Sequence, residues 1–563
     1  MCVVRSFLNP GSPRVEQYTA ALLVAFMAAV VLAPLILSLY RRRVVHLMAR
    51  PDGMSDAPEE PSGSSAPPAA PAGDKEFPEV EALKLASRER AQRLARSLRI
   101  TALIFTLTTV VMSLALKWQS THGSHGAAPE AGLVNAIAWS FAAVFWTLLV
   151  LGTAWPIVIL GTANPRFVRG FGLVTLPCLV LLLAMPIINS TLERSQLTGY
   201  LLLVAIVALL CLGLVPRHMR NVVPTLTLAL SLAVIAWIEA DNLTRGVNTC
   251  LGWLPIRDRA GAWRAAVFLV VVLTAMLLGA FFGIYRMLRA VASGYRNKRF
   301  SDAQLQALFW YGAVAGPIAA AIYASQRGPQ APPMALVIGV SALPTAIAYA
   351  WLTRRLPAPY RPSVTLLLLR VFGRTRRGER LLDRVAASWR FIGPVFMIGG
   401  PDLAQASLEP HELAAFLSGG LKQDFVADLA SLERTLADID LDPDPDRRYR
   451  VNEVYCAGDI WTRAAQQLIE RSAIVLIDLS EFHAGRQGTA TELAMLARLG
   501  ALSRTIAVVS KATDLQAVND ATDLSPSPTR AQSLRTLSIE DKADGEELFA
   551  RVIAARSAAK TQG

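Results

Sequence analysis

The fold is decided by residues 470–499, which read ERSAIVLIDLSEFHAGRQGTATELAMLARL. The run at 473–479 is apolar, rich in Ile, Val and Leu, and bounded by polar residues. A short run of this kind between two helical patterns is typical of a parallel strand that is buried on both faces. A loop that contains Gly follows, and Thr489 or Thr491 can cap a helix that carries Glu492 in its first turn. Polar groups at the carboxyl end of such a strand lie where open α/β sheets bind ligands.

Outward from this stretch, strands alternate with helices along the last third of the chain. The strand candidates are 364–372, 393–398, 451–455, 473–479 and 505–510, and the helix candidates between them include a polar insertion at 409–438 and a helix at 459–471. Strands that alternate with helices pair in parallel through right-handed crossovers. We therefore predict a three-layer α/β domain with a parallel sheet over residues 354–511. Residues 512–563 then form a polar tail that contains one helix.

The preceding part of the chain has the composition of a membrane protein. The 563 residues are 53% hydrophobic, and long apolar segments with almost no charge recur before residue 354. About 20 apolar residues are enough to cross a bilayer as a helix. The pattern predicts about nine transmembrane helices, at 18–40, 100–116, 133–160, 171–188, 197–215, 222–238, 265–285, 305–323 and 334–352.

The positions of Lys and Arg predict the orientation of these spans. Three consecutive Arg follow the first span, and basic residues gather in alternate loops after it. Because cytoplasmic loops carry an excess of Lys and Arg, we place residues 1–17 in the periplasm and 41–99 in the cytoplasm. An eight-helix membrane domain then occupies 100–353, and the α/β domain is cytoplasmic. The expected surroundings are the lipid bilayer of a bacterial inner membrane.

The predicted cytoplasmic segment at 41–99 has two parts of different composition. Residues 52–74 are rich in Pro, Ala, Ser and Gly, which offer too little apolar surface to form a core, so we expect disorder there. Residues 80–98 alternate apolar and charged side chains in the manner of an amphipathic helix. That helix either lies on the anionic surface of the bilayer or forms a solvated linker.

Charge and cysteine usage exclude two other classes of function. The formal net charge of +13 could indicate a nucleic-acid partner, but basic cytoplasmic loops account for it in a membrane protein, so no such partner is predicted. The five Cys residues are scattered without the spacing of metal ligands. The sequence therefore predicts neither a zinc site nor a disulfide framework.

The opening stretch resembles two families of nucleotide-handling domains. TIR-like domains have an apolar strand, a Ser, a variable loop and a Glu before an apolar residue, which correspond here to Ser480 and Glu492. LOG-like (lysine decarboxylase-like) proteins have the loop Gly-Gly-x-Gly-Thr-x-x-Glu, which corresponds to the run from Gly485 to Glu492, with Arg486 at the second Gly. The Trp that many TIR-like domains place before the Glu is absent. The resemblance covers the last third of the chain and implies a Rossmann-like fold that handles nucleotides such as NAD.

The resemblance also implies roles for particular residues. Glu492 would be the carboxylate that meets the ribose of NAD and helps to cleave the bond to nicotinamide, with Ser480 beside it. In the TIR-like domains the loop after the first strand lies by the nucleotide, which corresponds to Arg370, Gly373 and Arg374. From the residues alone, a Glu near the start of a helix is explained by the favourable helix dipole without any catalytic role.

Other candidate positions each have two interpretations. The loop at 373–378 holds three Arg, which can bind phosphate or can be attracted to acidic lipid next to the last predicted span. Gly399 and Gly400 end a predicted strand, where they allow either the close approach of a ligand or an ordinary turn. The remaining candidates for nucleotide binding are Gly485, Gly488 and Thr489.

The composition predicts a membrane-anchored protein, and the resemblance implies that it senses or processes an NAD-like nucleotide in a bacterial signalling or defence system. Enzymatic activity is left open, and NAD or a related nucleotide is the expected ligand or substrate. Two alternatives are a transporter or channel with a regulatory α/β domain, and a non-enzymatic membrane scaffold. The predicted spans carry almost no ionisable residues, which weighs against ion-coupled transport. A homo-oligomer is compatible with each of these functions.

Overall fold

The structure of the protein is a computed structural model. The residues that it describes are 13–48, 80–122, 222–227, 229–231, 233, 259–309, 311, 334–358, 363–370, 376–399, 408–421, 425–458, 460–522, 534–538 and 548–554. They belong to two compact units. The first unit takes in Met1–Ser38, Ala95–Leu352 and Ser407–Gly419, and the second takes in Leu39–Leu94, Thr353–Ala406 and Gly420–Gly563.

The second unit is built on a sheet of seven parallel strands, which confirms the prediction of an α/β fold. The strands are β1 (Leu366–Arg370), β2 (Val395–Gly399), β3 (Phe425–Val426), β4 (Val451–Cys456), β5 (Ile474–Asp478), β6 (Thr505–Val509) and β7 (Arg535–Ser538). Their order in the sheet is β3-β4-β2-β1-β5-β6-β7. With the two-residue edge strand β3 set aside, this is the order of the doubly wound sheets that bind dinucleotides.

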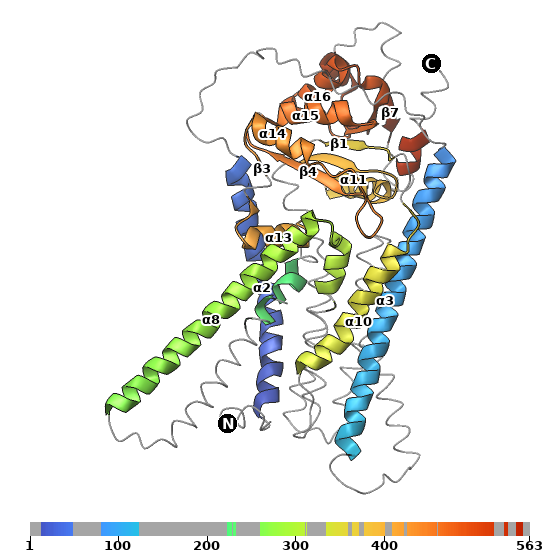
Figure 1. Ribbon diagram of the computed structural model, residues 1–563. Coiled ribbons are helices and arrows are strands. Elements are labelled where there is room, and N and C mark those ends of the chain that lie inside the picture. Colours follow the sequence, from blue (N-terminus) through green and yellow to red (C-terminus); the bar gives the residue numbers. More distant parts are fainter. Residues whose placement is uncertain are drawn as a thin grey trace. The chain divides into compact units, whose positions relative to one another are not determined.

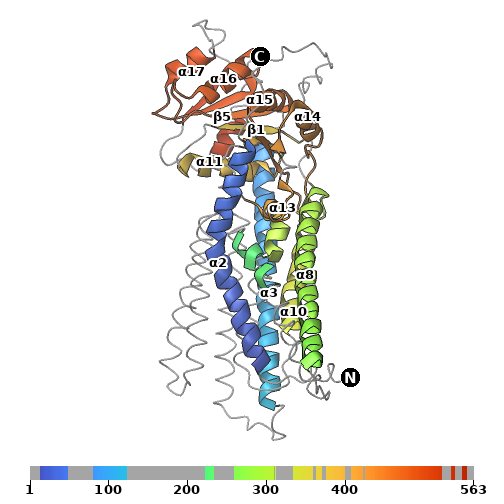
Figure 2. The same ribbon diagram turned by 90° about the vertical axis from the view of Figure 1, so that its left-hand side faces the viewer.

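Helices cover both faces of this sheet. The helices of the unit are α11 (Arg376–Trp389), α14 (Leu429–Ala437), α15 (Ile460–Arg471), α16 (Gln487–Arg498) and α17 (Leu515–Ala521), with a further helical segment at 548–554. Figures 1 and 2 show α15 and α16 on one face of the sheet and α11 on the other. The α/β unit therefore has three layers.

Alternation along the central strands explains why both faces are apolar. In β1, Leu367 and Leu369 belong to the core under α14, α15, α16 and α17, while Leu366 and Leu368 belong to the core on the side of α11. A strand that is covered on both faces needs apolar residues at every position, which is why the sequence shows short continuous runs. The largest fully buried side chain of the unit is Trp389 at the end of α11.

The C-terminal residues contribute more to the sheet than the sequence predicts. The predicted polar tail at 512–563 contains α17 and β7, and β7 pairs with β6 beyond the expected end of the sheet. In the segment 548–554, Leu548, Phe549, Val552 and Ile553 are buried in the core on the side of α11. The predicted polar insertion at 409–438 is also more varied than a helix, because it holds α13 (Pro410–Leu417), β3 and α14.

The charged helix at 80–98 is part of a longer helix, α3 (Val80–His122). No Gly or Pro interrupts these residues, so the helix continues without a break through the predicted span at 100–116. Its first turns belong to the second unit, where Leu83 is fully buried in the core on the side of α11. Ser87 Oγ donates to Ser388 O at 3.1 Å, and Arg90 donates to Phe391 O at 2.6 Å. This segment is therefore packed against the α/β core instead of being a solvated linker.

The first unit is helical in its described residues, but it does not support the prediction of nine membrane spans. The predicted spans at 18–40, 265–285 and 334–352 fall within α2 (Pro13–Met48), α8 (Arg259–Arg296) and α10 (Met334–Arg354), respectively. Among the described residues, one stretch, Ala82–Val111, is long and apolar enough to cross a bilayer. Three predicted spans lie wholly outside the described residues, at 133–160, 171–188 and 197–215. The tract at 52–74 also lies outside them.

We predict that Gly393→Ala destabilises the α/β unit. A Cβ atom at Gly393 would lie 1.8 Å from the backbone oxygen of Val364, which also accepts a hydrogen bond from Trp389 Nε1 at 2.8 Å. The entry to β1 must shift, and we expect a loss of about 1–3 kcal/mol in the free energy of unfolding. Thermal unfolding of the purified protein measures this loss.

Gly488→Ala is the matched control for that substitution. A Cβ atom at Gly488 would meet nothing within 4 Å, and the residue is helical. Ala is the better helix former, so the unfolding midpoint should stay the same or rise slightly. A Gly393→Ala protein as stable as the Gly488→Ala protein would contradict the close approach of Gly393 to Val364.

Candidate functional site

The candidate site lies where β1 and β5 end side by side at the centre of the sheet. The two strands pair in parallel, and Arg370 and Asp478, their last residues, are partners in the register. The chain runs from β1 towards β2 on one side, while β5 lies on the other side, so this is the switch point of the topology. In open α/β sheets, ligands bind in the crevice outside the carboxyl ends of strands at such a point.

The two predicted binding loops therefore begin at the same edge of the sheet. One follows β1 and contains Gly373 and Arg374, and the other follows β5 and contains Gly485 and Gly488. Gly373, Arg374 and Gly400 lie outside the described residues, and so does the side chain of Arg370. The structure brings the starts of both loops together and describes only the second loop.

Hydrogen bonds from the segment after β6 hold the loop after β5. Leu479 N donates to Val508 O at 2.8 Å, and Thr513 Oγ1 donates to Leu479 O at 2.8 Å. Ser510 Oγ donates to the backbone oxygen of Ser480. Further along the loop, Asp514 N donates to Phe482 O at 3.0 Å, and the Phe482 side chain is fully buried. The loop is thus fixed at its start and at its middle.

Ser480 and His483 lie in this loop and face different surroundings. Ser480 is partly exposed, and its backbone N–H donates to Asp478 Oδ1 at 2.9 Å. Asp478 is 1% exposed, so its carboxylate organises the turn out of β5. His483 is exposed, and its Nδ1 accepts from Gly485 N at 3.3 Å. The structure gives His483 a role in shaping the turn before α16.

Helix α16 begins earlier than the sequence predicts. Its first residue is Gln487, and the N-cap residue Arg486 makes no side-chain capping bond. The prediction that Thr489 or Thr491 is the cap is therefore wrong: Thr489 is buried inside the helix, and Thr491 Oγ1 donates to Gln487 O at 2.9 Å. Arg486 N donates to His483 O at 2.9 Å and closes a turn, and this turn directs the chain into the helix.

As a consequence, Glu492 lies in the second turn of α16 and not in the first. The explanation by the helix dipole is therefore wrong, because that effect falls off within the first turn. Glu492 is 3% exposed, and its Oε2 atom has no hydrogen-bond partner. Burial raises the pKa of this carboxyl group to about 8. Glu492 is thus a buried, neutral acid near neutral pH, and the candidate catalytic pair consists of one partly exposed and one buried side chain.

The predicted glycines differ in what surrounds them. A Cβ atom at Gly399 would lie 2.5 Å from the ring of Tyr455, its partner in the register of β2 and β4. The same ring lies 5.4 Å from that of Phe425. Gly399 therefore makes room for an aromatic side chain of the neighbouring strand. A Cβ atom at Gly485 would be 3.2 Å from the His483 ring, whereas the space beside Gly488 is open.

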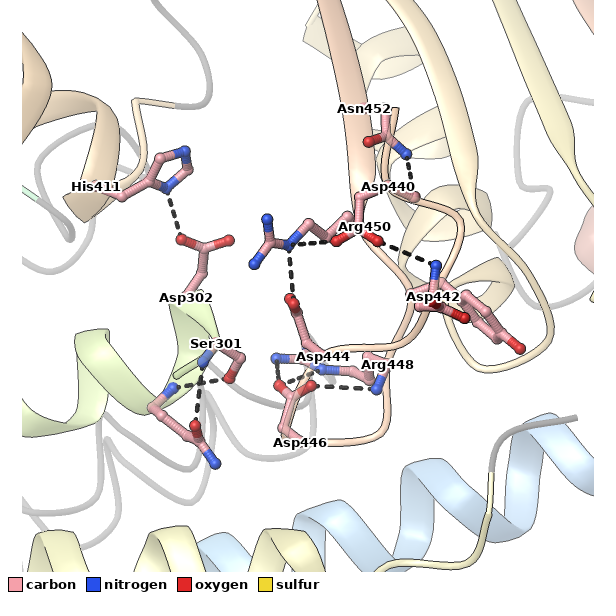
Figure 3. Close-up of polar contacts among 12 residues, drawn as sticks. Ser301, Asp302, His411, Asp440, Asp442, Asp444, Asp446, Arg448, Arg450 and Asn452 are labelled. Carbon is pink, nitrogen blue, oxygen red and sulfur yellow. Dashed lines mark hydrogen bonds and ion pairs between the residues drawn. The ribbon is translucent and has the colours of Figure 1, made fainter. Parts of the chain in front are cut away.

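The acidic loop at 440–446 forms a buried network of ion pairs in the α/β unit. Arg450 Nε lies 2.8 Å from Asp444 Oδ1, and Arg448 NH2 lies 2.8 Å from Asp446 Oδ2. The side chains of Asp444 and Asp446 are fully buried. Figure 3 shows these pairs along the loop that leads into β4. Buried charges need such partners, so this loop has a structural role.

The sequence did not predict the one possible cation-binding group among the described residues. It consists of Asp302, Glu409 and His411 in the first unit, whose ligand atoms lie within 4.8 Å of one another. No spacing rule could reveal it, because Asp302 is 109 residues away from His411.

We predict that Glu492→Gln stabilises the protein relative to the native chain, and that this gain in the free energy of unfolding is larger at high pH than at low pH. The pKa of Glu492 is raised by burial, so the unfolded chain releases this proton at lower pH than the folded chain does. The contribution of Glu492 to the stability of the native chain is therefore fully present below about pH 4.5 and is lost as the pH rises to about 8. Gln cannot ionise, so we expect a gain on the order of a few kcal/mol at pH 8 and little gain at pH 4.5.

Unfolding midpoints across this pH range measure that difference, and the exposed Glu470→Gln is the control. The control should follow the native protein at every pH. A Glu492→Gln protein that also follows the native protein at pH 8 would show that Glu492 is ionised and solvated in the folded chain.

Comparison with known proteins gives no further information on this site. We compared the chain with protein-family models, curated proteins and solved structures, and none of the three comparisons finds a match. A fold alone does not define a function. The residues that bear on function are those at the edge of the sheet where β1 and β5 end side by side.

Proposed function

We propose that the α/β unit binds a phosphate-bearing nucleotide of the NAD type in the crevice between the loops after β1 and β5. The observation that supports this most is the pairing of the two strands, whose last residues, Arg370 and Asp478, are aligned at the switch point. Ligands of doubly wound sheets bind at this point because both loops diverge from it. The motif that resembles TIR-like and LOG-like domains follows β5 and so lies at this edge.

The first turn of α16 supplies the chemistry for a phosphate group. The first N–H groups of any helix have no partner within the helix, and together with the helix dipole they attract anions. Gln487, Gly488 and Thr489 occupy these positions in α16. The open space beside Gly488 lets a ligand approach the backbone there. Arg374, in the loop after β1, is a second candidate group for phosphate binding.

The surroundings of Glu492 favour binding over cleavage. A carboxylate that stabilises a positive charge on a ribose must be ionised and must reach the ligand. Glu492 is buried, and burial raises its pKa to about 8, so most of its population is neutral at pH 7. The domain is accordingly a sensor that recognises a nucleotide, and turnover of NAD is the less favoured function.

The first unit is the membrane anchor in this proposal. Several of its helices expose large apolar side chains, among them Leu107 at 62% and Phe281 at 71% exposure. Basic residues lie next to these apolar residues along the helices; in α8, Arg286 and Arg289 come shortly after Phe281. Apolar faces next to Arg suit helices that sit in a bilayer with their basic ends in the cytoplasm. A polytopic inner-membrane unit with a cytoplasmic sensor is consistent with this pattern, and the number of spans is for topology mapping to decide.

We predict that Gly488→Asp weakens nucleotide binding while leaving the fold intact. The position is open, and an Asp in the first turn of a helix is favourable, but its charge repels a phosphate group. The isosteric Gly488→Asn is the matched control, because it has the same size without the charge. Calorimetric titration of the purified protein with NAD and with ADP-ribose should show that Asp weakens binding at least tenfold more than Asn does.

Equal affinities in the Asp and Asn variants would place the phosphate away from α16. If the native protein binds neither nucleotide and is not stabilised by either one, the proposed nucleotide-binding function is wrong.

We also predict that Glu492→Gln retains nucleotide binding and that the native protein does not release nicotinamide from NAD. Both follow from the burial of Glu492, which keeps the carboxyl group from the ligand. Chromatographic detection of nicotinamide measures turnover, and titration of the variant measures binding. Release by the native chain that Glu492→Gln suppresses would instead show that Glu492 becomes exposed and acts as a catalytic residue.

A further inference from the structure

We propose that Asp302, Glu409 and His411 bind a divalent transition-metal cation such as Zn²⁺ in the first unit. This site is independent of the nucleotide crevice, since it belongs to the other compact unit. One carboxylate comes from the segment after α8, and the other carboxylate and the imidazole come from the start of α13. The three ligand atoms lie within 4.8 Å of one another.

The spacing of the donor atoms suits a common cation. His411 Nδ1 lies 2.7 Å from Asp302 Oδ1 and 3.6 Å from Glu409 Oε2. Two ligands bound to zinc at about 2.1 Å are about 3.4 Å apart when the geometry is tetrahedral. The observed separations bracket this value, so small side-chain movements would bring the three atoms around one ion. Figure 3 shows the His411 ring directed at Asp302.

The backbone on both sides of the site is fixed. On the α8 side, Lys298 adopts φ 53°, with Arg299 N donating to Gly294 O at 2.9 Å, as in the glycine-type ending of helices. Ser301 and Gln304 then form a reciprocal capping box, with bonds of 3.0 and 3.2 Å. Asp302 is the first helical residue after this cap, so its position is set by the turn.

The α13 side is fixed in the same way. Glu409 N donates to Glu412 Oε2 at 2.8 Å at the start of the helix. The His411 ring stacks on Tyr295 of α8, with 3.6 Å between the ring centroids and 19° between the planes. This stacking sets the direction of the imidazole. Ligands that are held before the metal binds lose little freedom on binding, which favours affinity.

Electrostatics also favour a cation at this position. Two carboxylates that lie this close repel each other, and a neutral imidazole between them supplies no positive charge. A divalent cation bound between the two carboxylates would relieve this repulsion. One imidazole with two carboxylates suits zinc, manganese and iron(II), whereas Mg²⁺ prefers oxygen ligands and retains its water.

The test is metal binding by the full chain in detergent. The chain is stripped with a chelator and then titrated with Zn²⁺, and separately with Mg²⁺ as the comparison ion. We expect one Zn²⁺ per chain and binding of Mg²⁺ at least tenfold weaker. Asp302→Asn and His411→Ala should each weaken Zn²⁺ binding by about tenfold to a hundredfold or more. The matched control is His483→Ala, an exposed histidine of the other unit, which should bind Zn²⁺ as the native chain does.

Glu409→Gln keeps the proposal testable if the other variants fail to fold, because the Glu409 side chain, at 34% exposure, is the most exposed of the three, and Gln retains a side-chain oxygen for the cap of α13. It too should weaken Zn²⁺ binding. Absence of stoichiometric Zn²⁺ binding by the native chain would overturn the site. So would a native affinity for Zn²⁺ in Glu409→Gln, or a loss of affinity in His483→Ala equal to that in His411→Ala. Each of those outcomes would leave His411 and Asp302 as a hydrogen-bonded pair without a metal.

Discussion

The parallel pairing of β1 with β5 is the constraint on which the α/β unit depends. Both strands are covered on two faces, so each is almost wholly apolar, and their side chains alternate between the two cores. The pairing places two loops that are about a hundred residues apart at one edge of the sheet. It also requires the carboxylate of Asp478, at the end of β5, to be satisfied locally, which Ser480 N does. The candidate site is thus a consequence of the core, and the loops add specificity to it.

The central strands could be predicted because their pattern is a local property. A short run of Leu, Ile and Val between polar residues is sufficient to identify β1 and β5, and the alternation of strands with helices then predicts that the sheet is parallel. Strands at the edges could not be predicted in this way. In β7, Arg535 to Ser538 alternate between partly buried and exposed residues, and β3 has two residues. Their pairing depends on the neighbouring strand, so no local signal distinguishes them from a polar tail or a helical insertion.

The site was predictable in position but not in the environment of its side chains. Parallel topology alone indicates that the loop after β5 lies at the ligand edge. The burial of Glu492 depends on where α16 starts, and that start is set by a turn through His483 instead of by a capping Thr. A shift of the helix start by a few residues moves Glu492 from the first turn into the buried second turn. Gly399 likewise has its explanation in Tyr455 of β4, a partner that becomes known only with the strand register.

A neutral Glu492 and an anion site at the start of the same helix are physically compatible. The first turn of α16 attracts phosphate through its free N–H groups, and a negative charge inside the helix would oppose that attraction. Burial raises the pKa of Glu492 to about 8, so most of the Glu492 population carries no such charge at pH 7. In the proposed function, the chain thus keeps a carboxylic acid close to the proposed anion site with little repulsion of the anion. The proposed recognition of a nucleotide fits this arrangement, whereas cleavage would first require Glu492 to leave the core and ionise.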